Sequence, residues 1–279
     1  MGKPYQRNTL KIRSPGGGIG DELLASGVIR AIKIANPTCR ITFVTRYMDF
    51  WQGHPLLSSV VPAKDENKRD SLELSYRYQV PSNRNVFRLI CERVGLDADD
   101  FRPAPPEVTP SPWLTAELAA QKRPYIVIQT ETSNWTPNKT WPLERWQAVA
   151  QALSKDHLVI EAGTKPILNL SGPNFLSLAG RTTLTDLAFL ISKAKLYLGA
   201  ESGGMHMAAG FKTPAIIVFG GYTSPENFPY PNNIPFYTPV ECAPCWLRTP
   251  CPYGLKCMDA ISAAAVIGAA QKFLENKSR

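Results

Sequence analysis

The sequence predicts an α/β protein made of two halves, each built on a parallel sheet. Strand-like and helix-like patterns alternate along the chain, both halves open with an apolar strand, and a proline-rich stretch separates them. Such alternation is typical of parallel strands joined by helices. We therefore expect two sheets that face a common ligand cleft.

The first half, residues 1–101, begins as a strand, a glycine turn and a helix. Apolar side chains from Leu23 to Ile32 recur at helical spacing, and Asn36-Pro37 ends that helix. Strand-like and helix-like patterns then continue to the end of this half. Strands are expected over 9–13, 41–45, 58–61 and 72–78, and a second helix over 86–94.

Five prolines between positions 102 and 112 exclude a helix interior and a central strand there. We place the linker between the halves at residues 102–117. The second half, residues 118–258, restarts the alternation and contains a cysteine-rich loop over 242–257. Its strands are expected over 125–129, 157–161, 175–178, 196–198 and 215–219.

Three helix starts stand out in the second half. Pro142 suits a first helical turn, and Thr183 with Asp186 three residues later suits an N-cap. Asp259 is expected to cap the terminal helix of residues 259–279. We expect that last helix to pack back on the N-terminal half.

Composition excludes disordered and membrane-spanning classes. Of 279 residues, 44% are hydrophobic and 19% are charged, and no apolar run approaches the roughly 20 residues that span a bilayer. The polar N-terminus has no signal-peptide pattern. We expect a cytoplasmic protein that touches the inner face of a membrane. The net charge of +8 fits either ordinary solubility or attraction to an anionic partner.

The first chemical motif is the turn Gly16-Gly-Gly-Ile-Gly-Asp21. Gly18 and Gly20 let backbone N–H groups approach a phosphate or a sugar. The turn lacks the lysine of a P-loop, and Asp21 replaces the third glycine of a dinucleotide fingerprint. Asp21 either stabilises the helix dipole or takes part in proton transfer.

Two motifs in the second half follow strands. In Asn138-Lys-Thr-Trp-Pro142, Lys139 can reach a diphosphate as a point charge, or it is a solvated lysine. The stretch 199–210 reads as strand, glycine turn and helix, with His206 as either a ligand contact or a core histidine. Its candidate ligand-binding residues are Glu201, Ser202, Gly203, Gly204, Met205 and His206.

Four cysteines, Cys242, Cys245, Cys251 and Cys257, lie within 16 positions. In a chain without a secretory signal, clustered cysteines bind metal more often than they form disulfides. Four thiolates suit a structural zinc or iron ion. Reduced thiols and disulfides are the alternatives.

Together these motifs resemble glycosyltransferase family nine, the heptosyltransferases. The resemblance rests on Gly20-Asp21, Lys139-x-Trp141-Pro142, Ser202-Gly203-x-x-His206, Phe219-Gly220 and Cys257-Met258, all in the family's order. It implies a GT-B architecture of two Rossmann-like domains and inverting transfer from a nucleotide sugar, without a catalytic metal. The chain departs at Glu201, where the family usually has aspartate, and its first half is shorter than usual.

By this resemblance Asp21 is the catalytic base and Lys139 neutralises the leaving nucleotide. Thr130 lies where the family often places hydroxyls near phosphate, and Glu161 would bind the ribose. The implied donor is a heptose-like sugar on a nucleoside diphosphate, expected to be ADP. The implied acceptor is an anionic glycan or a lipopolysaccharide core, and some members hold iron in such a cysteine cluster.

Two other functions remain open at this point. One is a non-catalytic module that binds a nucleotide sugar. The other is a transferase that modifies a protein or a nucleic acid. The sequence shows no RNA-binding motif and no interleaving of aromatic and basic residues, so we expect no nucleic-acid partner.

Overall fold

The computed structural model describes residues 4–14, 16–65, 70–76, 83–98, 102–132 and 135–276. The chain forms two compact units. Unit 1 comprises Met1–Glu107 and Glu226–Tyr230, and unit 2 comprises Val108–Pro225 and Pro231–Arg279. Among the helices of the described ranges, none has both the length and the apolarity needed to cross a membrane.

Unit 1 contains a four-stranded parallel sheet with the order β3-β2-β1-β4. Its strands are β1 Thr9–Arg13, β2 Arg40–Thr45, β3 Ser59–Pro62 and β4 Leu72–Glu73. Its helical segments are η1 Pro4–Gln6, α1 Ile19–Ala35, α2 Met48–Trp51, η2 Ala63–Asp65 and α3 Val86–Val94. Strand β4 is shorter than the predicted strand, of which positions 77 and 78 lie outside the described residues. Because β1 has later strands on both sides, the strand order reverses next to it, which is where open α/β sheets bind ligands.

Unit 2 contains a six-stranded parallel sheet with the order β10-β9-β8-β5-β6-β7. The strands are β5 Tyr125–Gln129, β6 Leu158–Glu161, β7 Phe175–Ser177, β8 Leu196–Ala200, β9 Ala215–Val218 and β10 Asn233–Phe236. The order reverses between β5 and β8, where Ile128 lies beside Leu198. Residues that follow β5 and β8 therefore lie at the switch point of this sheet.

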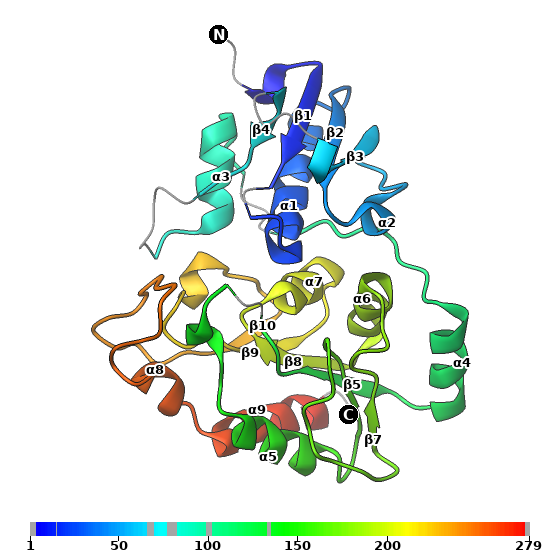
Figure 1. Cartoon of the computed structure of the whole chain (residues 1–279), viewed down its shortest axis with the longest axis vertical. Helices are drawn as coiled ribbons and strands as arrows, with labels where there is room; N and C mark the ends of the chain where they lie inside the picture. The colour runs from blue at the N-terminus through cyan, green and yellow to red at the C-terminus, as the bar shows by residue number, and fades with distance from the viewer. Residues whose placement is uncertain are drawn as a thin grey trace. The chain divides into compact units, whose positions relative to one another are not determined.

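Helices cover both faces of the second sheet, with α5 and α9 on one face and α6 and α7 on the other (Figure 1). The helical segments after the linker prolines are α4 Pro112–Gln121, η5 Pro137–Lys139, α5 Leu143–Leu153, α6 Leu184–Lys193, α7 Gly203–Phe211, η6 Pro225–Asn227, α8 Lys256–Asp259 and α9 Ala263–Asn276. Helix α4 begins inside the stretch that the sequence assigned to the linker, because Pro112 occupies a first-turn position.

The terminal helix α9 packs against α5 (Figure 1). Its buried residues Val266, Ala270 and Leu274 belong to the same hydrophobic core as Trp141 and Trp146. The expectation at the sequence level was packing on the N-terminal half. The structure makes α9 part of the core of unit 2, and the expected packing on the N-terminal half stays a prediction.

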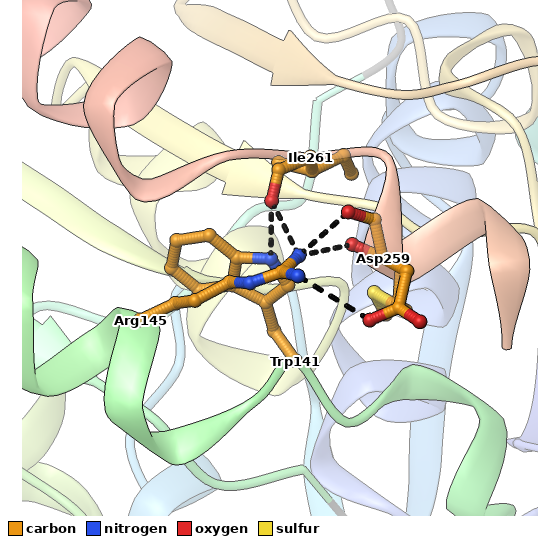
Figure 2. Close-up of polar contacts among 5 residues, drawn as sticks. Trp141, Arg145, Asp259 and Ile261 are labelled. Atoms are coloured by element: carbon orange, nitrogen blue, oxygen red, sulfur yellow. Dashed lines mark hydrogen bonds and ion pairs between the residues drawn. The ribbon is translucent and has the colours of Figure 1, made fainter.

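The capping predictions had two outcomes. Thr183 and Asp186 form a capping box at the start of α6, as predicted. The prediction that Asp259 caps the terminal helix is wrong, because Asp259 ends α8. The hydroxyl of Ser262 accepts the Ala265 N–H at 3.2 Å instead. Asp259 pairs with the Arg145 guanidinium (Figure 2).

Candidate functional site

The glycine turn of unit 1 leads from β1 into α1. Gly18 is the N-cap of α1, and Gly20 and Asp21 lie in its first turn. The Tyr76 hydroxyl donates to Asp21 Oδ1 at 3.2 Å. Gly17 has a φ of +66°, and a β-carbon there would collide with the Arg46 guanidinium. The turn thus needs glycine, and it presents a half-buried carboxylate at the helix start.

Glu22, next to Asp21, is a buried acid that the sequence analysis did not single out. Its carboxylate accepts hydrogen bonds from the Thr45 hydroxyl and the Trp51 indole, both at 2.6 Å. Burial raises the pKa of Glu22, and these donors act in the opposite direction. Glu22 therefore ties α1 to the end of β2 and to α2, whereas Asp21 faces a less enclosed environment.

The central feature of unit 2 is an ion pair between Lys139 and Glu201. Lys139 ends the single turn η5, which Thr136 caps, and Glu201 directly follows β8. Only 13% of the Lys139 side chain and 5% of the Glu201 side chain are exposed. The Lys139 ammonium also lies 4.5 Å from the centre of the Tyr222 ring. A buried pair of this kind stands at the switch point of the sheet.

His206 lies in α7, close enough to Lys139 for the lysine charge to affect its pKa. Burial, and to a smaller extent the charge of the Lys139 ammonium, lower the pKa of His206 to about 3. The imidazole is therefore neutral near pH 7, so Lys139 supplies the positive charge of this cluster. A neutral ring can donate from one nitrogen and accept at the other.

Ser202, which follows Glu201, is the N-cap of helix α7, and its side chain makes no capping hydrogen bond. Its first turn contains no acidic residue. At Gly204 a β-carbon would collide with the Tyr197 hydroxyl and with Gln129 Oε1. Gly204 thus lets the helix lie close to the sheet, while the Met205 side chain is fully buried and packs in the core. The helix start can face an anion with its backbone N–H groups.

Two other predicted donor residues lie at strand ends of the same sheet. Thr130 follows β5 and is buried. Glu161 ends β6, and its Oε1 accepts the N–H groups of Ile167 and Leu168 at 2.7 and 2.8 Å. Its Oε2 accepts from the Ser177 hydroxyl. In this structure Glu161 supports the loop after β6 with both of its oxygens.

Tyr222 and Thr223 follow β9, and the sequence analysis gave neither a site role. The Thr223 hydroxyl is buried and has no hydrogen-bond partner among the residues that the structure describes. A buried hydroxyl without a partner is costly unless a ligand or water satisfies it. The sequence offered one signal for Thr223, which is that it lies a few residues after an apolar strand.

The four clustered cysteines are free thiols, with Cys257 buried and Cys242, Cys245 and Cys251 partly buried. The Tyr253 N–H donates to Cys251 Sγ at 3.4 Å. Burial raises the pKa of Cys245 and Cys257, and the neighbouring thiols raise it further. Within the described ranges, no three His, Cys, Asp or Glu side chains form a group that could hold a metal ion. The donor atoms suit zinc or iron, but their arrangement here does not converge on one point.

The structure brings together Lys139, Glu201 and His206 in unit 2, with Thr130 and Ser202 at neighbouring strand ends. Asp21, Gly18 and Gly20 lie in unit 1. Asp21 follows β1, and Thr130 and Glu201 follow β5 and β8, the strands at which each sheet reverses order, whereas Glu161 ends β6. The point of reversal is the usual location of a ligand site in an α/β sheet.

Known proteins resemble the chain in sequence. The family model described as glycosyltransferase family 9 (heptosyltransferase) matches residues 65–251, more than half of the chain. Lipooligosaccharide heptosyltransferase 2 of Campylobacter jejuni subsp. jejuni is 27% identical over 152 residues, which cover 50% of this chain and 47% of that protein. The chain spans about half the length of the curated relatives it matches.

Solved structures resemble the fold. ADP-heptose LPS heptosyltransferase II of E. coli has a TM-score of 0.67 at 15% identity, over 97% of this chain and 100% of that one. TibC, an iron-containing dodecameric glycosyltransferase of enterotoxigenic E. coli, has a TM-score of 0.69 at 17% identity, over 96% and 76% of the two chains. These likenesses confirm the predicted α/β fold with parallel sheets of the GT-B type.

Proposed function

Because the chain belongs to glycosyltransferase family 9, the heptosyltransferase family, we propose that it transfers a sugar from a nucleoside-diphosphate donor to a hydroxyl acceptor. One observation carries the proposal: the buried Lys139–Glu201 pair beside His206, at the switch point of the second sheet. A lysine that is largely shielded from water, near the carboxyl ends of parallel strands, suits the negative charge of a diphosphate.

The donor side of the proposal uses the second unit. The Lys139 ammonium and the backbone N–H groups at the start of α7 bind the diphosphate oxygens. Ser202, Gly203 and the Thr223 hydroxyl, which has no partner in the described part of the chain, add polar contacts. Glu201 is released from Lys139 as the diphosphate arrives, and it then orients the donor through its hydroxyls.

The transfer is a single displacement. The acceptor oxygen forms a bond to the anomeric carbon as the bond from that carbon to the diphosphate oxygen breaks, which inverts the configuration. Asp21 takes the proton of the acceptor hydroxyl, and Lys139 stabilises the charge that develops on the leaving diphosphate. A carboxylate suffices as base because the hydroxyl becomes acidic as its oxygen bonds to carbon.

We propose a heptose linked to ADP as the donor. Support comes from a similar protein, TibC, which has been solved in complex with ADP-D-beta-D-heptose. Glu161 is a weaker candidate for the ribose, since both of its oxygens are engaged by the loop after β6. The proposed acceptor is a hydroxyl of an anionic glycan or a lipopolysaccharide core, with which the net charge of +8 is compatible. We further propose that the protein works in the cytoplasm, with peripheral contact to a membrane, and that the cysteine cluster holds a structural zinc or iron ion.

Calorimetry with ADP, UDP, GDP and CDP tests the donor proposal, and a transfer assay with ADP-heptose and lipopolysaccharide core acceptors tests the reaction. We expect ADP to bind most tightly and the sugar to appear on the acceptor. Absence of binding to all four diphosphates would overturn the proposal. Tight ADP binding without transfer or donor hydrolysis would favour a non-catalytic module instead.

A further inference from the structure

The residues around Lys139 form hydrogen bonds with a segment that lies more than a hundred positions later in the chain. We call residues 135–145 the lysine segment and residues 242–261 the cysteine segment. Hydrogen bonds join the two segments on both sides of Lys139. All of these residues belong to unit 2.

The first set of bonds lies on the N-terminal side of Lys139. The Asn138 amide donates to the carbonyl oxygens of Leu247 and Thr249 at 2.9 and 2.8 Å. The Thr136 hydroxyl donates to the same Leu247 carbonyl at 2.7 Å and accepts the Asn138 N–H at 3.2 Å. Asn138 and Thr136 are each only 2% exposed. Buried hydrogen bonds of this kind are costly to break because the carbonyls would lose their donors.

The second set lies on the C-terminal side. The Trp141 indole donates to the Ile261 carbonyl at 3.1 Å, and the Arg145 guanidinium donates to the same carbonyl at 2.7 Å (Figure 2). The guanidinium also donates to the Asp259 carbonyl at 2.9 Å and to Asp259 Oδ1 at 3.3 Å (Figure 2). Trp141, a residue of the family motif, thus fixes the end of the cysteine segment.

Tyr222 links the cysteine segment to Lys139 itself. The ring of Tyr222 lies under the Lys139 ammonium, and its hydroxyl accepts the Trp135 indole N–H at 2.7 Å. The backbone N–H groups of Cys245 and Trp246 donate to the carbonyls of Gly221 and Tyr222 at 2.8 and 3.1 Å. The cysteine segment therefore holds two neighbours of the ammonium, the Asn138 side chain and the backbone at Tyr222.

We propose that Asn138 is a positioning residue for Lys139, and that the cysteine segment sets the position of the ammonium through the carbonyls of Leu247 and Thr249. Asn138 and Lys139 are neighbours in one short 3₁₀ turn, which makes too few internal hydrogen bonds to hold its own shape. The anchored amide fixes the backbone from which the flexible lysine extends. A lysine placed before the ligand arrives loses less conformational entropy on binding. The inference rests on the proposed function, in which Lys139 binds the diphosphate.

The variant Asn138→Asp keeps the size of the side chain but replaces the amide donor with an oxygen that repels both carbonyls. Calorimetry would compare ADP with adenosine, which lacks the phosphates. We expect ADP affinity to fall by about tenfold or more, the effect of losing roughly one well-placed charged contact. Adenosine affinity should stay within about twofold. Asn169→Asp, the same change at an exposed position of unit 2, is the matched control.

A double-mutant cycle separates positioning from simple stability. In a Lys139→Ala background, Asn138→Asp should cause no further loss of ADP affinity, because the group that it positions is gone. Thr136 offers a gentler pair of variants: Thr136→Val removes the hydroxyl at constant volume, and Thr136→Ser retains it. We expect the valine variant to weaken ADP binding and the serine variant to restore it.

The outcomes distinguish this inference from the proposed function. Equal ADP binding by the wild type and Lys139→Ala would overturn the role of Lys139 and the inference with it. If Lys139→Ala weakens ADP binding while Asn138→Asp and Thr136→Val do not, the inference alone fails. Equal losses of ADP and adenosine affinity, or additive losses in the cycle, would also overturn it. If Asn138→Asp does not fold, the Thr136 pair decides the question.

Discussion

The two strand-to-helix turns of this protein have opposite electrostatic character. Helix α1 carries Asp21 and Glu22 in its first turn, so its positive N-terminus already faces carboxylates. Helix α7 has no acidic residue there, and Lys139 lies beside its start. The first turn therefore suits proton acceptance and disfavours an anion, whereas the second suits an anion. Similar glycine turns serve different chemistry because of the residues that follow them.

The charged groups beside both turns have identified partners. Asp21 accepts a hydrogen bond from the Tyr76 hydroxyl, and Lys139 contacts Glu201 and the Tyr222 ring within a segment held at both ends. The two turns thus differ in the sign of the charge that they present. Four measurements can test this contrast, beginning with the largest expected effect.

Asp21→Asn should lower kcat for sugar transfer by roughly 10²- to 10⁴-fold, since a positioned general base contributes about that much. ADP affinity should stay within a few-fold, because Asp21 does not bind the diphosphate. Steady-state kinetics and calorimetry measure the two effects. Asp49→Asn, an exposed acid in the first turn of α2, is the matched control. Near-native turnover of Asp21→Asn would leave Asp21 only its interaction with the helix dipole.

Lys139→Ala should weaken ADP binding by about one to two decades, from the loss of a charge-assisted hydrogen bond worth roughly 1.5–3 kcal/mol. It should also lower thermal stability, because Glu201 is left buried without its partner. Glu201→Gln in the same chain should recover the stability but not the affinity. Lys155→Ala, at an exposed lysine of unit 2, is the control. Unchanged ADP affinity would place Lys139 outside the site.

His206 should make folding stability depend on pH. Its pKa is near 3 in the folded protein and about 6.5 in the unfolded chain, so the unfolded chain binds more protons between these values. Stability is then full above pH 6.5 and falls as the pH decreases toward 3. At pH 5 the loss of stability, relative to the value well above pH 6.5, is about 2 kcal/mol. Thermal unfolding of His206→Asn should show a flatter slope in this range.

His54 in unit 1 needs a separate variant in the same experiment. Burial lowers the pKa of His54 as well, so it adds to the slope with the same sign. Comparing His54→Asn with His206→Asn assigns a slope to each unit. A slope that His206→Asn leaves unchanged would contradict the neutral, buried histidine of unit 2.

The cysteine cluster should have the smallest effect on chemistry. We expect protein purified without added metal to contain about one equivalent of zinc or iron, which requires the four thiols to draw closer together than they are here. Cys242→Ser should lower the melting temperature before it lowers kcat. Absence of metal, with six free thiols and an unchanged melting temperature in Cys242→Ser, would make the cluster a packing feature.

Much of the fold could be predicted because its helices and strands have clear local sequence patterns. The helix Val86–Val94 and the capping box at Thr183 follow directly from apolar spacing and side-chain chemistry. Strand β10, Asn233–Phe236, was missed because Pro235 and the neighbouring polar residues do not fit the usual sequence pattern of a strand. Its place at the edge of the sheet tolerates a proline. The start of α9 was misplaced because Asp259 and Ser262 are both good capping residues.

Part of the candidate site could also be predicted from the sequence. Lys139, Glu201 and His206 follow strands, and parallel strands end at one edge, so their convergence in unit 2 could be expected. The contacts of Asn138 could not, since its partners are backbone carbonyls about 110 positions away. A carbonyl acceptor has no side-chain signature in a sequence. Residue roles at both turns stay predictions until the variants are measured.

The fit at Gly204 limits which substitutions the start of α7 can accept. The Tyr197 hydroxyl and Gln129 Oε1 occupy the space that a β-carbon at position 204 would need. A larger residue there would have to displace the buried Tyr197 or push α7 away from the sheet. Under the proposed function, a different donor sugar is then accommodated by Glu201 and by the loop that carries Lys139. We expect donor selectivity to evolve through that loop while position 204 stays glycine.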